Sequence, residues 1–172
     1  MRYKHLLIND DYYSFVAPVA KTSTYGWLCG CGLQEGSGVY KLLSALPKGQ
    51  ILVGSPQADD GSRDKFRTQN SIRYFNRVWG RKHEFRESLL THYKFHLFFN
   101  AAQLPRGFVG SMNMTANRWN EVMIEVELTV TNELTHLFST LWRNAKEVSA
   151  HKGTLLQNFA ERVVKRAMDT EK

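Results

Sequence analysis

Side chains that bind and transfer phosphate are concentrated in two short segments of this sequence. The first segment holds His92 and Lys94, and the second holds Ser111 and Asn113, with Glu121 eight residues after the asparagine. Lysine supplies a compact positive charge, while serine and asparagine donate hydrogen bonds to phosphate oxygens. Histidine is the side chain best suited to attack phosphorus or to move a proton near neutral pH. Together these residues predict a site for a phosphate ester.

The spacing of these residues predicts how they are presented. Residues two apart on a strand project from the same face, about 6 to 7 Å apart, so His92 pairs with Lys94 and Ser111 with Asn113. Apolar residues flank both segments, so we expect the pairs at strand ends, where a central sheet opens into a cleft. Glu121 adds a carboxylate that can orient an imidazole. A lone histidine on an apolar strand is usually a buried core residue, but the ordered set favours a site.

The residues before this set indicate a strand, a helix and a second strand. Residues 25–33 are apolar and bounded by glycine, as in a buried strand, and residues 39–46 have a helical spacing of apolar side chains. Residues 50–54 predict another buried strand, and such a unit usually forms a parallel pair. Residues 55–70 are rich in turn residues and predict a loop, which a helix over 70–79 follows.

The second half of the chain predicts more strands and then helices. Strands are expected over residues 91–99, 107–111 and 121–130. Thr131 is expected to cap a helix with an apolar stripe, and the capping box at 154–157 predicts a second helix. The predicted fold class is therefore α/β, with a mixed central β-sheet flanked by helices.

Composition predicts one globular domain without a membrane span. The 172 residues are 42% hydrophobic and 23% charged, and no apolar run approaches the roughly 18 residues that a membrane helix needs. We expect a single domain over 1–172, with an N-terminal segment at 1–20 and C-terminal helices in 131–172. Cys29 and Cys31 would point to opposite faces of a strand, so we expect buried thiols in a reduced, cytoplasmic protein.

The positive charge of the chain is concentrated in one segment. The formal net charge is +7, and eight cations but two anions lie between residues 63 and 86. A local cationic surface favours a polyanion as partner, with nucleic acid ahead of an acidic membrane, and a solvated face is the alternative. The candidate phosphate contacts are Arg73, Arg77, Arg81 and Lys82.

The motifs resemble those of a known family. His92-Tyr93-Lys94, Gly110-Ser111-Met112-Asn113 and Asn120-Glu121 are similar to the HxK…GSxN…E pattern of the phospholipase D superfamily. The full family pattern has an aspartate five residues after the lysine, where this chain has Phe99. Nuclease branches that lack this aspartate use an acid after GSxN, so the resemblance makes Glu121 the candidate, with Glu125 as the second choice.

The resemblance implies a reaction without metal or cofactor. In this superfamily one histidine attacks phosphorus to form a phosphohistidine, a second protonates the leaving oxygen, and water cleaves the intermediate. Members with one motif copy, as here, pair two subunits across one active site. The expected function is thus a metal-independent endonuclease that cleaves DNA as a homodimer, with His92, Lys94, Ser111, Asn113 and Glu121 as catalytic residues. The alternatives are a phospholipase or phosphatidyltransferase of the same superfamily, and a catalytically decayed nucleic-acid-binding module.

Overall fold

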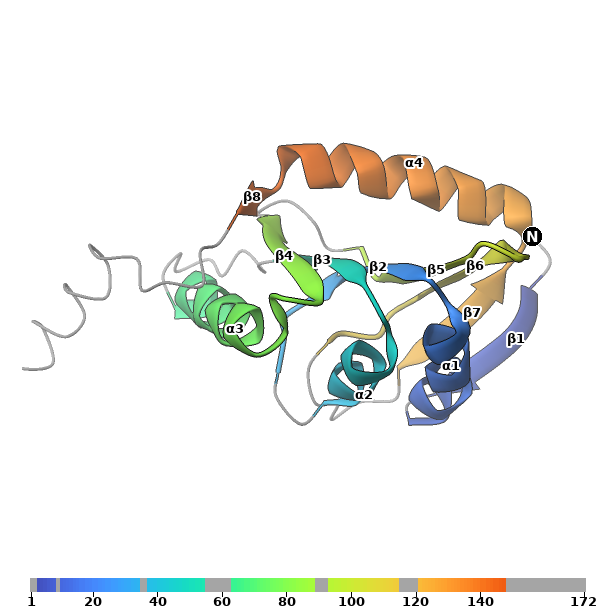
Figure 1. The fold of residues 1–172 in the computed structure, drawn as a ribbon, viewed down its shortest axis with the longest axis horizontal. Coiled ribbons are helices and arrows are strands. Elements are labelled where there is room, and N and C mark those ends of the chain that lie inside the picture. The colour runs from blue at the N-terminus through green and yellow to red at the C-terminus, as the bar shows by residue number, and fades with distance from the viewer. Residues whose placement is uncertain are drawn as a thin grey trace, which may run out of the picture.

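A mixed sheet between two layers of helices forms the fold (Figure 1). The computed structural model describes residues 3–8, 10–34, 37–54, 63–88, 93–114 and 121–147. The strands in these ranges are β1 (Tyr3–Ile8), β2 (Tyr25–Cys31), β3 (Gly49–Gly54), β4 (His83–Ser88), β5 (Phe95–Asn100), β6 (Gln103–Gly110), β7 (Val122–Val126) and β8 (Lys146–Glu147). The helices are α1 (Asp10–Thr22), α2 (Gly38–Ala45), α3 (Arg63–Trp79) and α4 (Leu128–Asn144).

The strand order of the sheet is β1-β7-β6-β5-β2-β3-β4-β8. Strands β2, β3 and β4 are parallel, with Gly54 opposite both Cys31 and Ser88, whereas β5 runs antiparallel to β2 and to β6. The last residues of β2, β3, β4 and β6 therefore lie at the same end of the sheet as the first residues of β5 and β7. We call this end the site end, and the opposite end, where β2, β3 and β4 begin, the distal end.

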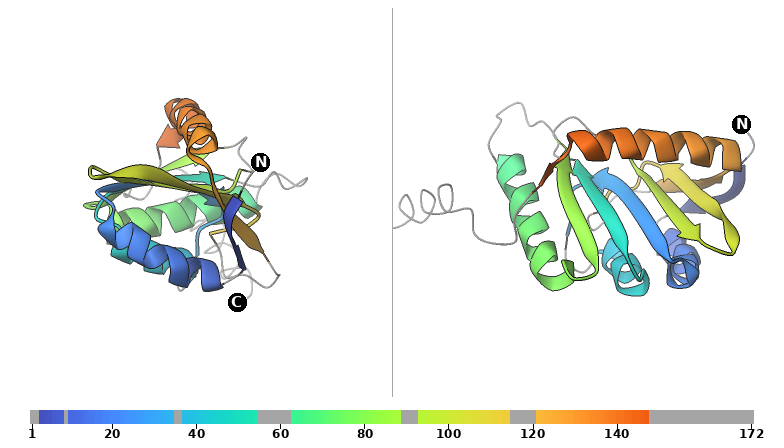
Figure 2. Two further views of the ribbon diagram at one scale, coloured as in Figure 1. Left: turned by 90° about the vertical axis from the view of Figure 1, so that its right-hand side faces the viewer. Right: turned by 45° about the horizontal axis from the view of Figure 1, so that its top comes forward.

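Each face of the sheet carries its own hydrophobic core. Helices α1, α2 and α3 cover one face, and α4 crosses the other (Figures 1 and 2). The first core includes Leu28, Ile51 and Phe108 under the three helices, all fully buried. In the second core Phe138 of α4 stacks on Trp27, with 4.8 Å between the ring centroids.

The structure confirms the predicted α/β class and the strand–helix–strand unit. Strand β2, helix α2 and strand β3 follow one another, and β2 pairs with β3 in parallel. Cys29 and Cys31 are buried free thiols, as expected. The capping box at 154–157 lies outside the described residues.

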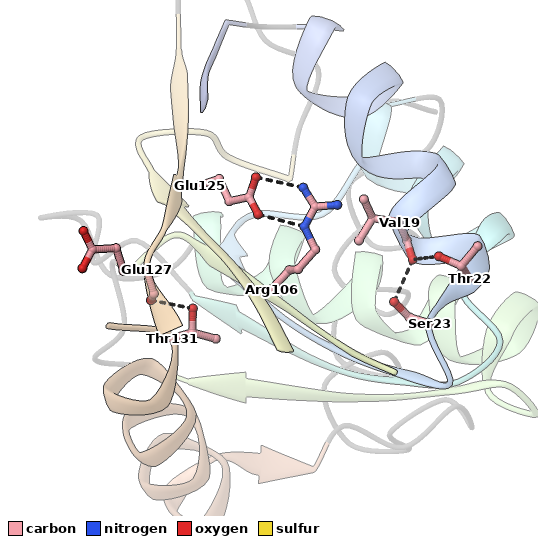
Figure 3. Close-up of polar contacts among 7 residues, drawn as sticks. All are labelled: Val19, Thr22, Ser23, Arg106, Glu125, Glu127 and Thr131. Atoms are coloured by element: carbon pink, nitrogen blue, oxygen red, sulfur yellow. Dashed lines mark hydrogen bonds and ion pairs between the residues drawn. The ribbon is translucent and has the colours of Figure 1, made fainter. Parts of the chain in front are cut away.

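Several element boundaries differ from the sequence predictions. The strand predicted over 91–99 begins only at Phe95, and the strand predicted over 107–111 begins already at Gln103. The predicted loop over 55–70 is wrong in its second part, because α3 begins at Arg63. The predicted strand over 121–130 ends at Val126, and α4 begins at Leu128 with Glu127 as its N-cap. Thr131 is therefore inside the helix instead of capping it, and its hydroxyl donates to the Glu127 carbonyl at 3.0 Å (Figure 3).

Thr131 has a packing role instead. Its side chain is fully buried against β6, where a Cβ placed on Gly107 would lie 2.6 Å from the Thr131 hydroxyl oxygen. Glycine at position 107 thus lets α4 approach the sheet closely. Because the apolar alternation of β7 continues through Leu128 and Val130, the sequence pattern concealed the boundary between strand and helix.

Candidate active site

Four of the five predicted catalytic residues lie at the site end of the sheet. Lys94 directly precedes β5, and its carbonyl accepts from the Gly110 amide at 3.1 Å. Ser111 follows β6 and makes two contacts with Val122: its amide donates to the Val122 carbonyl at 2.9 Å, and its hydroxyl accepts from the Val122 amide at 3.1 Å. These contacts join the start of β5, the end of β6 and the start of β7. His92 lies outside the described residues.

Glu121 is bonded to Asn113. One carboxylate oxygen accepts from the Asn113 amide at 2.7 Å, and the other is 3.5 Å from the side-chain nitrogen of Asn113. The glutamate is only 9% exposed, so a charge-assisted bond here is little weakened by water. Asn113 Oδ1 is buried without a hydrogen-bond partner among the described residues. The carboxylate predicted to orient an imidazole thus fixes the loop that carries the asparagine.

Lys94 is buried at the site end, with only 8% of its surface exposed. It acts on Cys31 at the end of β2: burial raises the pKa of this thiol, while the charge and a hydrogen bond of Lys94 lower it. The Glu121 carboxylate also raises the pKa of Cys31. Lys94 and Glu121 are therefore both within electrostatic reach of one thiol. The sequence predicts only a core role for Cys31, and its position at the end of a buried strand is the feature that indicates a place beside the site.

A tyrosine on α1 makes a hydrogen bond to a buried histidine of β5. His96 is fully buried, and its Nδ1 lies 2.5 Å from the hydroxyl of Tyr12 on α1. Burial lowers the pKa of His96 to about 3 and raises that of Tyr12. Both groups are therefore uncharged, and one hydrogen bond joins the phenol to the neutral imidazole. His96 is held two residues from Lys94 as part of the core, which removes it as an alternative proton donor.

Glu125, the second choice for the acid, is committed elsewhere. Both of its carboxylate oxygens accept from Arg106, each at 2.8 Å (Figure 3). Glu125 stands opposite Phe108, in the middle of the sheet, and its side chain is 3% exposed. Of the two carboxylates that the sequence proposed, Glu121 is therefore the one beside Asn113 at the site end.

The structure does not bring the predicted phosphate contacts to the site end. Helix α3 follows β3, so it starts near the site end and runs toward the distal end, where β4 begins. Arg73 is midway along the helix and donates to Asn70 at 3.0 Å. Arg77, Arg81 and Lys82 are at the distal end, about 17 Å or more from the site end by the length of a six-residue strand.

The described residues contain no group of three histidine, cysteine, aspartate or glutamate side chains that could hold a metal ion. Within the same ranges, no helix has the length and apolar character needed to cross a membrane.

Comparison with known proteins identifies the fold. No protein-family model and no curated protein sequence matches this chain. Among solved structures, Nuc from Salmonella typhimurium, a phospholipase D family member, is similar over 83% of this chain and 95% of its own, with 13% identity and a TM-score of 0.57. NucT from Helicobacter pylori is similar over 85% and 99%, with 10% identity and a TM-score of 0.59.

A larger protein contains the same fold as a part. Polyphosphate kinase from Porphyromonas gingivalis is similar over 96% of this chain but 31% of its own, with 16% identity and a TM-score of 0.60. The chain therefore has the fold of the phospholipase D superfamily, which confirms the fold expected from HxK and GSxN. Because the identities are this low, the fold is what the likeness establishes.

Proposed function

We propose that this protein is a metal-independent endonuclease that cleaves DNA through a phosphohistidine intermediate. The observation that carries the proposal is the meeting of Lys94, Ser111 and Asn113 at one end of a phospholipase D fold, with Glu121 bonded to the asparagine. A buried ammonium group and neighbouring hydroxyl and amide donors suit the oxygens of a phosphodiester. The net charge of +7 supports a polyanionic substrate.

In the proposed reaction the His92 imidazole attacks phosphorus. The bond from phosphorus to the leaving oxygen breaks as the nitrogen–phosphorus bond forms, and a second, protonated imidazole gives its proton to that oxygen. Water then adds to phosphorus as the nitrogen–phosphorus bond breaks, and its proton passes to the second imidazole. Lys94 and Asn113 hold the non-bridging oxygens, and Glu121 keeps Asn113 in place.

The second imidazole is proposed to come from another copy of the chain. His83 and His96 are both buried, bonded to the Leu43 carbonyl and to Tyr12. His136 is exposed on α4, on the outside of the other layer. None of these three histidines is therefore suited to meet Lys94 across a phosphate. A two-fold dimer that brings two His92 side chains together would complete the site.

Supercoiled plasmid incubated in excess EDTA tests the proposed function. Nicking is expected to persist in the wild type and in Lys41→Ala, an exposed lysine on α2, and to disappear in His92→Ala and Lys94→Ala. Thermal melting of each variant checks that it is folded. Cleavage that EDTA abolishes and magnesium restores would disprove the proposed chemistry. Release of choline from phosphatidylcholine vesicles without any cleavage of DNA would favour the phospholipase alternative.

A further inference from the structure

Four cations meet at the distal end of the sheet, away from the candidate active site. Lys48 and Lys82 directly precede Gly49 and His83, which are register partners on β3 and β4. Neighbouring strands are about 4.8 Å apart, so these two lysines start from adjacent backbone positions. The other two members are Arg77, in the last turn of α3, and Arg81, in the turn that joins α3 to β4. We call Lys48, Arg77, Arg81 and Lys82 the distal basic cluster.

Most of this charge is not compensated within the described structure. Lys48, Arg77 and Arg81 are exposed, and no ion pair involves them among the described residues. The ammonium group of Lys82 has one hydrogen-bond partner, because it donates to the Ser44 carbonyl in the last turn of α2 at 3.0 Å. The one acidic side chain in this part of β4, Glu84, accepts from Gln50 at 3.4 Å.

Helix ends do not account for the cluster. The C-termini of α2 and α3 lie at the distal end, and each carries a partial negative charge of about half a unit. Four cations exceed the sum of these two partial charges and that of Glu84 by about two units. A positive field therefore remains at an exposed surface made of long, adaptable side chains. Such a surface suits closely spaced phosphates, because lysine and arginine bind backbone phosphates without reading a sequence.

The distance between the distal basic cluster and the active site determines how far apart along DNA the two bound phosphates would lie. Measured along the strand direction, β4 covers about 17 Å from the site end to the distal end, and the turn before it brings this component of the separation to roughly 20 Å. Along a DNA duplex this distance corresponds to about six base pairs, at 3.4 Å for each. A phosphate bound at the cluster is therefore several base pairs away from a phosphate held by Lys94.

We propose that the distal basic cluster is a second contact surface for the DNA backbone, which anchors the substrate about six base pairs from the cleaved bond. The inference rests on the proposed function only in placing the cleaved bond at the site end. Its consequence is a length threshold: a duplex too short to reach both ends of the sheet cannot use the cluster, whereas a longer one gains affinity from it.

Equilibrium binding of DNA hairpins tests this proposal. In a His92→Ala background, which prevents cleavage, fluorescence anisotropy compares stems of about 4 and about 20 base pairs with the same loop, lengths on either side of the six-base-pair threshold. The variant Lys48→Gln/Arg77→Gln/Arg81→Gln keeps Lys82 and its contact with α2. We expect the parent to bind the long stem at least tenfold more tightly than the short stem, and the triple variant to lose most of this preference. We also expect the variant to reduce the slope of log affinity against log salt concentration by about 2 to 3.

The matched control is Arg143→Gln, because Arg143 is also an exposed cation in the last turn of a 17-residue helix. It is expected to match its parent in both measurements. The charge reversal Lys48→Glu serves as a second variant if the triple variant melts at a much lower temperature. An unchanged length preference and salt slope in the distal variants would overturn the proposal. Tighter binding of the parent to phosphatidylserine vesicles than to the long hairpin would overturn its assignment to DNA.

Binding and cleavage separate this inference from the proposed function. If the wild-type protein binds long stems through the cluster but never cleaves DNA, the proposed nuclease function is contradicted and the proposed DNA contact at the distal basic cluster is supported. Cleavage of plasmid with no effect of the distal variants on binding would do the reverse.

Discussion

Glu121 acts on the candidate site through an amide it holds in place. Its bond to the Asn113 backbone is 2.7 Å long and almost buried, and a charged hydrogen bond of this kind contributes about 1.5 to 3 kcal/mol. The position of Asn113 relative to Ser111 and Lys94 therefore depends on a carboxylate eight residues further along the chain. This makes the charge on Glu121 a determinant of the geometry of the phosphate site.

Replacing Glu121 by Gln should lower kcat for DNA cleavage at least tenfold. The change keeps the size of the side chain but removes the charge and one acceptor, so the loop that carries Asn113 loses a strong bond. Urea unfolding should show a loss of about 1 to 2 kcal/mol. Glu133→Gln, on the exposed side of α4, is the control. Equal kcat values for the two variants would show that the bond is dispensable.

The buried His96 should make stability fall in acid. Its pKa is about 3 in the fold against an ordinary value of 6.5, so below pH 6.5 the unfolded chain binds a proton that the folded chain refuses. The contribution is complete above pH 6.5 and is lost as the pH falls toward 3, by up to about 1.4 kcal/mol per pH unit. Urea unfolding of wild type and His96→Gln at several pH values measures it.

The His96→Gln variant should be less stable than the wild type at neutral pH. Its free energy of unfolding should also fall less steeply than that of the wild type between pH 6.5 and 5. His136→Gln replaces an exposed histidine and should keep the wild-type slope. If His96→Gln also kept that slope, the folded protein would take up a proton at His96 as readily as the unfolded chain does.

At the level of elements, the sequence predicts those that carry their own pattern. Strand β2, helix α2 and strand β3 are apolar and bounded by glycine or proline, so local periodicity located them. Strand β4 was missed because three of its residues are His83, Arg86 and Glu87. Each has a partner on a distant element: the Leu43 carbonyl, the Trp142 carbonyl and Gln69. A polar strand stabilised by distant partners has no local pattern to detect.

The candidate site divides in the same way. Lys94, Ser111, Asn113 and Glu121 are close to one another because each stands next to a strand end, which motif spacing and apolar flanks indicated. The support that α1 gives to β5 joins residues 84 positions apart, and neither the helix nor the contact was predicted. The polar start of the chain gave no indication that Tyr12 would be fully buried.

The contact between α4 and β6 should be sensitive to one methyl group. Gly107→Ala places a Cβ 2.6 Å from the Thr131 hydroxyl oxygen, and overpacking of this kind typically costs about 1 to 3 kcal/mol. Thr131→Ala removes that hydroxyl, so the double variant should lose less stability than the sum of the single variants, by at least about 0.5 kcal/mol. Urea unfolding of all four proteins completes the cycle, and strict additivity would mean that α4 shifts freely.

At the level of the whole molecule, the proposed chemistry requires two copies of the chain. Light scattering should give about twice the chain mass of 19.8 kDa. Wild type and His92→Ala are mixed in equal amounts and allowed to exchange subunits fully. The mixture should have about one quarter of the activity of pure wild type at the same total protein concentration, because one dimer in four then carries both histidines. Half of the activity would show that each chain works alone. Arg143→Gln subunits in the same mixture should leave the activity unchanged.

The pairing of β1 with β7 has a consequence for how the chain folds. Tyr3 stands opposite Val126, and Ile8 opposite Val122, so the first strand joins the sheet through a segment made more than one hundred residues later. Closing so long a loop delays this pairing and favours slow folding. During synthesis on the ribosome β1 has no partner until β7 has emerged, and its open edge is a place where nascent chains could pair wrongly.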